Sequence, residues 1–472
     1  MHVLLNFISL PFIGEVDLGG GLLFLFFFCL LATVGFEFVN GFHDTANAVA
    51  TVIYTKALKP LVAVPWSGFF NFLGVFTGGV AVAMGILKLV PLNEMMALPV
   101  KIGAILVLSV LLAAIVWNLG TWWLGIPCSS SHTMIGAMIG GGLGFTMYYA
   151  GSVNWSKASE IGLSLIMSPL FGFGAAMLLM YFLRHVIKSP ILFHAPTGEN
   201  DRPPILIRLL LITTCTLVSF FHGSNDGQKG VGLLMLILIA FLPAKFAVDR
   251  NTDDSKILVS LNSIKGAIAK VDPTKTGQAA IDQLNAAVDT AKVTIAGGMS
   301  RDDKHVFAFR KQLQAVVKDA KAVLANQGVI LPEANRATLA SASRGLNDTT
   351  EYAPVWAIAI ISCSLGIGTM IGWKRIVLTI GEKIGKEHLN YAQGATAEIT
   401  AAATIGLSSG FGLPVSTTHV LSSGIAGAMV ASNGTKNLNS NTLKAIGMAW
   451  ILTLPVSIVI SFVLFFIFHL FV

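Results

Sequence analysis

Charged side chains are scarce in this 472-residue chain: they make up 12% of it, against about a quarter of a typical soluble globular protein. Apolar residues make up 54%. This composition excludes soluble, disordered and fibrous proteins. Cysteine is scarce too, and all four cysteines fall in apolar segments, which argues against a secreted disulfide scaffold and a thiolate metal site. A polytopic membrane protein is the class that remains.

The few charges concentrate in one segment, since residues 249–350 hold 25 of the 55 charged residues. The other 370 residues contain apolar runs for about ten to twelve spanning helices of roughly 20 residues each. The net charge is +7, and the basic residues outside that segment lie in short links, chiefly 184–208 and 374–386, which the positive-inside rule assigns to the cytoplasm rather than to nucleic acid. The apolar run at 19–39 is too long for a signal-peptide core and is expected to be the first span.

Two motifs occur twice in the apolar part. Residues 125–132 read GIPCSSSH and residues 412–419 read GLPVSTTH. A weaker pair is GFHDTANA at 41–48 and GSNDGQKG at 223–230, where only Gly and Asp coincide. The motifs are 84 residues apart in the first half and 189 in the second, and the excess of 105 nearly equals the 102-residue polar segment. Without that segment the halves come into register, a pattern typical of transporters with interrupted helices.

We therefore expect an all-α polytopic membrane protein of two inverted repeats with broken or re-entrant helices, plus a small soluble helical insert. The insert is predicted to be helical because apolar residues such as Val306, Phe309 and Leu313 recur at steps of three and four. Its sequence shows no catalytic or metal-binding constellation, which leaves a structural or regulatory role. The predicted boundaries are 1–187 for repeat 1, 188–204 for a linker, 205–248 and 351–472 for repeat 2, and 249–350 for the insert.

The hydroxyl motifs have the features of two helix starts. Proline breaks the preceding helix, and Ser or Thr favours the N-cap of the next one. About four backbone N–H groups at such a start lack helical partners, and in lipid an anion suits them. Two starts aimed at one point predict a pocket for a small oxyanion, and hydroxyls can also accept the proton of hydrogen phosphate. The predicted phosphate ligands are Ser129, Ser130, Ser131, Ser416, Thr417 and Thr418.

Two other interpretations of these motifs stay open. Ser and Thr in membrane helices often bond to their own backbone or hold helices together, although the repetition of the proline and histidine favours a site. A catalytic Ser–His pair is the second. Ser131–His132 and Thr418–His419 are sequence neighbours that point to different sides of a helix, but other Ser/His combinations in space remain open.

The acidic motifs place Asp44 and Asp226 at the ends of apolar runs. These carboxylates could lie in solvated loops, but their equivalent positions beside amides favour a role in holding a cation or relaying a proton. Glu37 and Glu398 are undecided between a role in the cavity and simple pairing, and His222 could be a core histidine satisfied by backbone. The predicted coupling-ion residues are His43, Asp44, Asn47, Asn225, Asp226 and Lys229.

At these residues the chain resembles the inorganic phosphate transporter family, the Pit-type permeases, and most closely the bacterial low-affinity members. The resemblance rests on GFHDTANAVAT at 41–51, GIPCSSSHTMIG at 125–136, HGSNDGQKG at 222–230 and GLPVSTTHVLSSG at 412–424. It covers essentially the whole membrane portion. It implies a multi-pass secondary transporter of the bacterial inner membrane, not an enzyme, which imports phosphate by alternating access. The hydroxyl motifs would bind phosphate and the acidic motifs would couple a cation.

Two positions depart from the family pattern, in which the acidic motif is typically GANDVANA in both copies. The chain has His43 and Lys229 where the family has asparagine. A fixed ammonium would repel or replace a bound sodium ion, while histidine titrates near physiological pH. We therefore expect coupling to protons rather than to sodium.

The resemblance to bacterial members also implies protons, with a neutral divalent metal–phosphate complex as the transported species. Asp44 and Asp226 would then face its metal, a cation such as Mg²⁺ that is a co-substrate and not a resident cofactor. The expected partners are phosphate, protons, divalent metal and lipid, with no nucleic acid; a homodimer stays open. The alternatives are a sodium-coupled phosphate symporter, a permease for another oxyanion or a bare metal, an anion channel and an intramembrane hydrolase.

Overall fold

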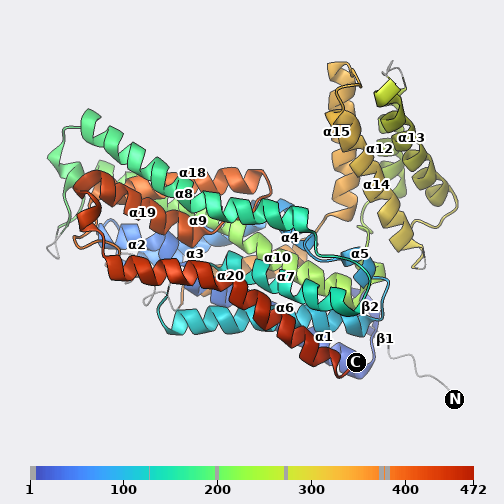
Figure 1. Cartoon of the computed structure of the whole chain (residues 1–472), viewed down its shortest axis with the longest axis horizontal. Helices are drawn as coiled ribbons and strands as arrows, with labels where there is room; N and C mark the ends of the chain where they lie inside the picture. The colour runs from blue at the N-terminus through green and yellow to red at the C-terminus, as the bar shows by residue number, and fades with distance from the viewer. Residues whose placement is uncertain are drawn as a thin grey trace. The chain divides into compact units, whose positions relative to one another are not determined.

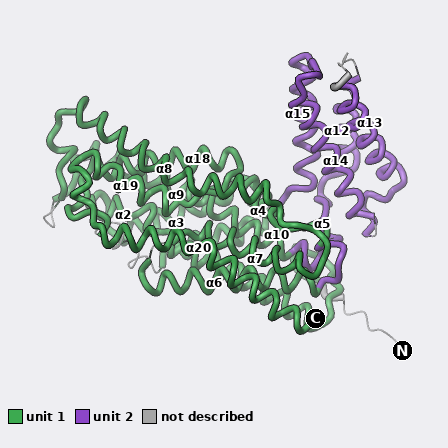
Figure 2. The backbone as a smooth tube through the Cα atoms, viewed as in Figure 1, with its two compact units in different colours: residues 1–94, 101–237, 353–472 green, residues 95–100, 238–352 purple. Residues whose placement is uncertain are grey.

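The computed structural model describes residues 7–126, 128–196, 201–269, 275–303, 305–371, 377 and 383–472. Pro127 and parts of the links 188–204 and 374–386 lie outside this range. The chain forms two compact units, coloured separately in Figure 2. The membrane unit comprises residues 1–94, 101–237 and 353–472, and the insert unit comprises residues 95–100 and 238–352. The domain boundaries predicted above stay predictions.

The first half of the chain begins with a β-hairpin that was not predicted from the sequence. It pairs β1 (Phe7–Leu10) with β2 (Gly14–Asp17) antiparallel around a turn in which Phe12 and Gly14 have positive φ. The helices that follow are α1 (Gly20–Asp44), α2 (Ala46–Tyr54), α3 (Pro60–Thr77), α4 (Ala81–Leu87), α5 (Leu92–Met95), α6 (Val100–Trp123), α7 (Ser130–Tyr148), α8 (Trp155–Val186) and the 3₁₀ turn η1 (Pro190–Phe193).

The second half repeats this order around the insert. Its described elements are α9 (Ile205–His222), the π-helical turn η2 (Gly223–Gly227), α10 (Gln228–Phe241), α16 (Val355–Thr369), α18 (Tyr391–Gly410), α19 (Thr417–Asn433), the 3₁₀ turn η3 (Thr435–Asn437) and α20 (Ser440–His469). Almost everything described is helical, so the prediction of an all-α polytopic membrane protein is confirmed (Figure 1).

By length and hydropathy, the described residues contain six membrane-spanning candidates, or seven if one bent helix pair is included. This count rests on the length and apolarity of each described helix by itself. Helices α7, α16 and α19, which are 19, 15 and 17 residues long, and helix α18 carry many Gly, Ser or Thr residues and are not among the six. The six candidates are Gly20–Tyr54, Pro60–Thr77, Val100–Trp123, Trp155–Val186, Ile205–Phe241 and Ser440–His469.

The helix contacts show how the two halves exchange partners. Helix α7 packs along α20, and α19 packs in the same way along α8. Likewise α1 packs on α16, and α9 packs on α3. Helices α7 and α19 start side by side, with the ring centroids of His132 and His419 4.6 Å apart, and extend toward opposite ends of the unit (Figure 1). The two starts thus point at one place from opposite directions.

Glycines allow the exchanged helices to approach at backbone distance. A Cβ at Gly140 of α7 would lie 2.1 Å from the Ile458 carbonyl oxygen of α20. A Cβ at Gly427 of α19 would lie 2.2 Å from the Phe173 carbonyl oxygen of α8. Close contact through small residues is typical of helix association in lipid, because burial of apolar surface contributes little to the association of helices there.

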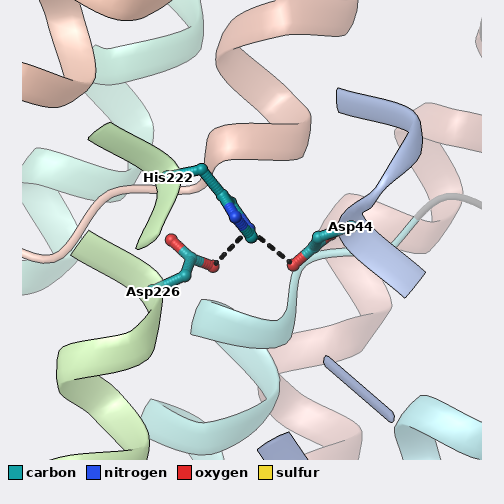
Figure 3. A group of neighbouring side chains, drawn as sticks. All are labelled: Asp44, His222 and Asp226. Atoms are coloured by element: carbon teal, nitrogen blue, oxygen red, sulfur yellow. Dashed lines mark ion pairs between the residues drawn. The ribbon is translucent and has the colours of Figure 1, made fainter. Parts of the chain in front are cut away.

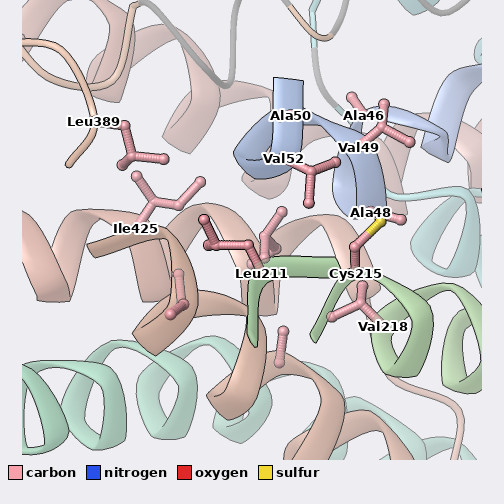
Figure 4. Close-up of a cluster of buried hydrophobic side chains, with 14 of the residues drawn as sticks. Ala46, Ala48, Val49, Ala50, Val52, Leu211, Cys215, Val218, Leu389 and Ile425 are labelled. Atoms are coloured by element: carbon pink, nitrogen blue, oxygen red, sulfur yellow. The ribbon is translucent and has the colours of Figure 1, made fainter. Parts of the chain in front are cut away.

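The apolar core of the membrane unit joins segments from both halves. Figure 4 shows side chains of α2, such as Val49, beside Leu211 and Cys215 of α9 and Ile425 of α19, all of which are fully buried. This packing fixes α2 against the second half, so the residues just before α2 are positioned by helices far away in sequence.

The insert unit contains α11 (Pro243–Phe246), α12 (Asp254–Ile268), α13 (Lys275–Ala296), α14 (Val306–Ala325) and α15 (Glu333–Thr350). As the periodicity predicted, the stripe with Phe309 and Leu313 is buried. Arg310, on the same helix, is 4% exposed and donates to the carbonyl oxygens of Ala247 and Thr350, at the two ends of the insert chain. Burial lowers the pKa of its guanidinium from the usual value.

We predict that Arg310→Met loosens the insert. Two buried carbonyls would lose their donor, at a cost of about 1–3 kcal/mol each. Hydrogen–deuterium exchange of the full-length protein in detergent should then be faster in α12, α14 and α15. The matched control is Arg344→Met on α15, where the arginine is exposed, and it should leave exchange unchanged. Equal exchange in both variants would contradict the role given to Arg310.

We also predict that Gly140→Ala destabilises the membrane unit by about 1–3 kcal/mol, because its Cβ would force α7 away from α20. The thermal unfolding midpoint of the purified protein should fall. Gly120→Ala in α6 is the control, since a Cβ there meets nothing within 4 Å. A midpoint that is equally unaffected by both substitutions would show that the α7–α20 contact tolerates separation.

Candidate functional site

Both hydroxyl motifs fold into the same local structure. Gly125 and Gly412 have φ of 66° and 67°, a conformation that glycine adopts without strain. Ser129 and Ser416 are then the N-caps of α7 and α19, and each hydroxyl oxygen accepts a hydrogen bond of 3.2 Å from the backbone N–H three residues later. The repeated letters of the sequence therefore encode a repeated helix start.

The acidic motifs lie where membrane helices are interrupted. Asp44 is the last residue of α1, and Thr45 separates it from α2. Asp226 lies in the π-helical turn η2 between α9 and α10. Single π-helical turns inside longer helices are frequent at functional sites, because they displace side chains from the regular helical positions.

The two carboxylates meet around one hydroxyl and one imidazole (Figure 3). Ser130 Oγ lies 2.9 Å from Asp44 Oδ2 and 3.2 Å from Asp226 Oδ2. His222 Nε2 lies 3.7 Å and 3.8 Å from the same two oxygens. Asp44, Asp226 and His222 are each at most 2% exposed, and their ligand atoms all lie within 4.8 Å of one another, as a metal ion would require.

Asn71 of α3 orients the His222 ring. Its side-chain nitrogen donates to Thr369 Oγ1 at 3.0 Å, so its oxygen faces His222 Nδ1 at 2.8 Å and accepts the proton there. Nε2 is thereby directed at the carboxylates, and it can offer them a proton or offer its lone pair to a cation. Such support of a ligating imidazole is usual in metal sites.

Each acidic motif contacts the hydroxyl motif of the other half. Asn47 donates to Thr418 Oγ1 at 2.9 Å and to Asp44 Oδ1 at 3.2 Å, and the Thr418 hydroxyl donates to Asp44 Oδ1 at 2.7 Å. In the other half Lys229 pairs with Asp226 Oδ1 at 2.7 Å and donates to Ser131 Oγ. The two acidic motifs are thus held by the helix starts opposite them.

Of the twelve residues predicted for binding or coupling, eight are brought together at this point. The group is Asp44, Asn47, Asp226, Lys229, Ser130, Ser131, Thr417 and Thr418, with Thr417 Oγ1 3.3 Å from the Asn47 side-chain nitrogen. Their assignment to phosphate or to a coupling ion stays a prediction.

The other four predicted residues, Ser129, Ser416, Asn225 and His43, contact the backbone or side chains outside this group as well. Ser129 and Ser416 are used as helix caps, and Ser129 Oγ also lies 2.8 Å from His132 Nδ1. Asn225 holds the loop before α19 through the backbone of Leu413 and Val415. His43 Nδ1 lies 3.5 Å from Asp44 Oδ1, while its Nε2 faces the Cys128 sulfur at 3.6 Å.

Two further glutamates are fully buried in the same unit. Glu37 accepts a hydrogen bond of 3.3 Å from Asn40 and packs against Gly230, next to Lys229. Glu398 of α18 accepts hydrogen bonds from Thr51 of α2 and Thr214 of α9. Both therefore lie in the interior and not in simple ion pairs with lysine, a possibility the sequence left open for Glu398.

His222 and Asn71 are the residues that the sequence reasoning undervalued. His222 stands immediately before the second acidic motif, and this adjacency was the available signal. Asn71 is one polar residue in an apolar run, and intramembrane polar residues usually have a function. Their meeting depends on the contact between α3 and α9, which the motif alignment could not supply.

Comparison with known proteins shows the family to which the chain belongs. Residues 40–461 match the model of a family described as the phosphate transporter family. The chain is 40% identical to the low-affinity inorganic phosphate transporter PitB of Escherichia coli K12, over 95% of this chain and 97% of that protein. It is also 40% identical to the low-affinity inorganic phosphate transporter of Buchnera aphidicola from Acyrthosiphon pisum, over 94% and 96%. These relatives are named as transporters and not as enzymes.

A solved structure titled as the sodium-dependent phosphate transporter shares the fold, with a TM-score of 0.57 and 21% identity over 95% of this chain and 100% of that one. The family match covers both repeats and every residue of the site around Asp44, and the spans make the protein a multi-pass membrane protein. The chain belongs to the phosphate transporter family.

Proposed function

We propose that this protein carries inorganic phosphate across the membrane as a divalent metal–phosphate complex, in symport with protons and by alternating access. The observation that carries the proposal is the contact of hydroxyls from both helix starts with two buried carboxylates. Ser130 reaches Asp44 and Asp226, and Thr418 reaches Asp44 from the opposite half. An anion site and a cation site therefore share the same atoms.

This shared site favours a metal–phosphate complex over bare phosphate. An oxyanion on the Ser130 and Thr418 hydroxyls would face the Asp44 and Asp226 carboxylates, and like charges in a buried site repel strongly. A divalent cation between the carboxylates, with His222 Nε2 as a third ligand, would turn repulsion into attraction. Carboxylate oxygens are the ligands that Mg²⁺ prefers, and it keeps waters or phosphate oxygens on its other positions.

The phosphate oxygens would be bound at the starts of α7 and α19. The first turn of each helix supplies N–H groups without intrahelical partners and the positive end of the dipole. The hydroxyls of Ser130 and Thr418 can rotate from their present carboxylate acceptors to the phosphate, and the Thr417 hydroxyl, which accepts from Asn47, can donate to it as well, because a hydroxyl both donates and accepts.

The charge balance favours a proton as the coupled ion. With Asp44 and Asp226 ionised and Lys229 protonated, these three groups would together carry one negative charge. A neutral metal–phosphate complex does not change this balance, whereas one added proton cancels it. Uncompensated charge is costly in a membrane interior. The imidazole of His43, whose Nδ1 lies 3.5 Å from Asp44 Oδ1, is a group that can hold such a proton.

Alternating access would follow from the exchange of partners between the halves. Every group of the site is buried, and its walls come from both repeats. Movement of the helices of one repeat relative to the other around this fixed point would open the site first to one side and then to the other.

Labelled phosphate uptake into proteoliposomes tests the proposal. With magnesium inside and outside, no sodium and an inward proton gradient, phosphate should accumulate, and an ionophore that collapses the gradient should abolish accumulation. Chelation of divalent metal should lower the initial rate at least about ten-fold, because a bare oxyanion would face the carboxylates. Uptake that requires sodium would contradict the proposed proton coupling, and so would phosphate that only equilibrates across the membrane whatever the proton gradient. Transport of sulfate by a protein that does not transport phosphate would contradict the proposed substrate.

We predict that His222→Ala raises the magnesium concentration for half-maximal uptake by about 10–100-fold, as expected for a lost metal-site group. The magnesium dependence of the initial uptake rate in sodium-free vesicles measures it. His388→Ala replaces an exposed histidine in a loop and serves as the control. An unchanged magnesium requirement in His222→Ala would remove His222 from the metal site.

A further inference from the structure

Glu37 is a fully buried carboxylic acid of α1 that takes no part in the contacts around Asp44 and Asp226. Its Oε2 accepts one hydrogen bond of 3.3 Å from the Asn40 side chain, and its Oε1 has no hydrogen-bond partner among the described residues. The side-chain oxygen of Asn40 is likewise buried without a donor in the described part of the chain. This place therefore has more acceptors than hydrogens, and one added proton would supply a donor.

The helix opposite makes room for this carboxyl group. A Cβ at Gly230 of α10 would overlap the side chain of Glu37. When the acidic motifs of the two halves are aligned, Glu37 is opposite Ser219 and Gly230 is opposite Ala48. The Ser219 hydroxyl donates to the backbone of its own helix at 2.8 Å. The buried acid and the space for it thus occur in one half only, so the repeated fold requires neither.

The charged side chains near enough to act on Glu37 are Asp44, Asp226 and Lys229. Asp44 lies about two turns further along α1, and helices α2 and α16, which contact α1, contain no charged residue. Lys229 is already paired with Asp226 at 2.7 Å. An ionised Glu37 would therefore add a carboxylate without an ion pair to a membrane interior, a cost that a proton on Glu37 removes.

We propose that Glu37 binds one of the protons that accompany phosphate and releases it on the side to which phosphate is delivered. The proposal rests on the proposed function, because it assigns a driving proton to one residue. Lys229 adjoins Gly230, against which Glu37 packs, and so connects the two places. Its ammonium contacts both Asp226 and Ser131. An ionised Glu37 competes for this ammonium, whereas a protonated Glu37 leaves it at the substrate site, so proton binding and substrate binding favour each other.

Glu37→Gln tests the proposal, because the amide has the shape of the protonated acid and cannot exchange the proton. Steady-state phosphate accumulation is measured in sodium-free proteoliposomes with magnesium, at zero membrane potential and an inward proton gradient. Each coupled proton contributes about ten-fold to accumulation for a gradient of about one pH unit. Glu37→Gln should therefore accumulate about ten-fold less phosphate than the wild type at such a gradient. Exchange of labelled for unlabelled phosphate without a gradient should persist, because it needs no net movement of protons.

Two further variants separate this role from a structural one. Glu37→Asp keeps a carboxyl group that binds a proton, and should accumulate more phosphate than Glu37→Gln. Glu160→Gln makes the same change at an exposed glutamate that is paired with Lys157, and should accumulate phosphate as the wild type does. Accumulation by Glu37→Gln equal to that of the wild type would overturn the proposal.

Infrared difference spectroscopy of the purified protein tests protonation without transport. Addition of magnesium and phosphate to the wild type should produce the carbonyl band of a protonated carboxylic acid. The band should shift in Glu37→Asp, disappear in Glu37→Gln and remain in Glu160→Gln. A spectrum without a substrate-dependent band from Glu37 would overturn the proposal. Failure of the wild type to accumulate phosphate on a proton gradient would instead refute the proposed function, and the band would still show whether Glu37 gains a proton with the substrate.

Discussion

Two carboxylates that share one hydroxyl in a buried site impose an electrostatic demand that the rest of the membrane unit satisfies. Ser130 has one hydrogen to give, yet its oxygen lies within 3.2 Å of both Asp44 and Asp226. A proton, an imidazolium, an ammonium or a metal ion must supply the missing positive charge. Lys229 Nζ lies 2.7 Å from Asp226 Oδ1 and His222 Nε2 lies 3.8 Å from Asp226 Oδ2, close to the helix breaks after α1 and at η2.

The same demand explains why the halves are interwoven. A hydroxyl motif alone would present a helix start, and an acidic motif alone would present a carboxylate. Only the exchange of α7 and α19 between the halves brings Thr418 to Asp44 and Ser131 to Lys229. The close glycine contacts along α20 and α8 then hold the two starts in place, so packing far from the site determines the distances within it.

Much of this could be predicted from the sequence because the signals are local. Glycine, proline and hydroxyl residues fix a helix start wherever they occur, so the motifs at 125–132 and 412–419 identified α7 and α19 before their packing was known. The alignment of Asp44 with Asp226 also identified the carboxylate pair. The amphipathic stripe around Phe309 was enough to predict helices in the insert.

Contacts between distant segments could not be predicted in this way. His222 is oriented by Asn71 of α3, and Ser129 and Ser416 are N-caps because α7 and α19 begin at the next residue. Glycine-rich helices such as α7 lie inside the unit, where neither length nor apolarity is required of them.

The exchange of contacts also bears on the origin of the chain. A polypeptide with one acidic and one hydroxyl motif could form the Ser130–Asp44 contact within itself, but the Thr418–Asp44 and Lys229–Ser131 contacts need two copies. Two identical copies would have the same side chain at both equivalent positions. Fusion of the halves into one chain removes that restriction, since one copy can keep the amide of Asn47 while the other acquires the ammonium of Lys229. Duplication within a single chain is thus what permits the site to be symmetric in shape and asymmetric in charge.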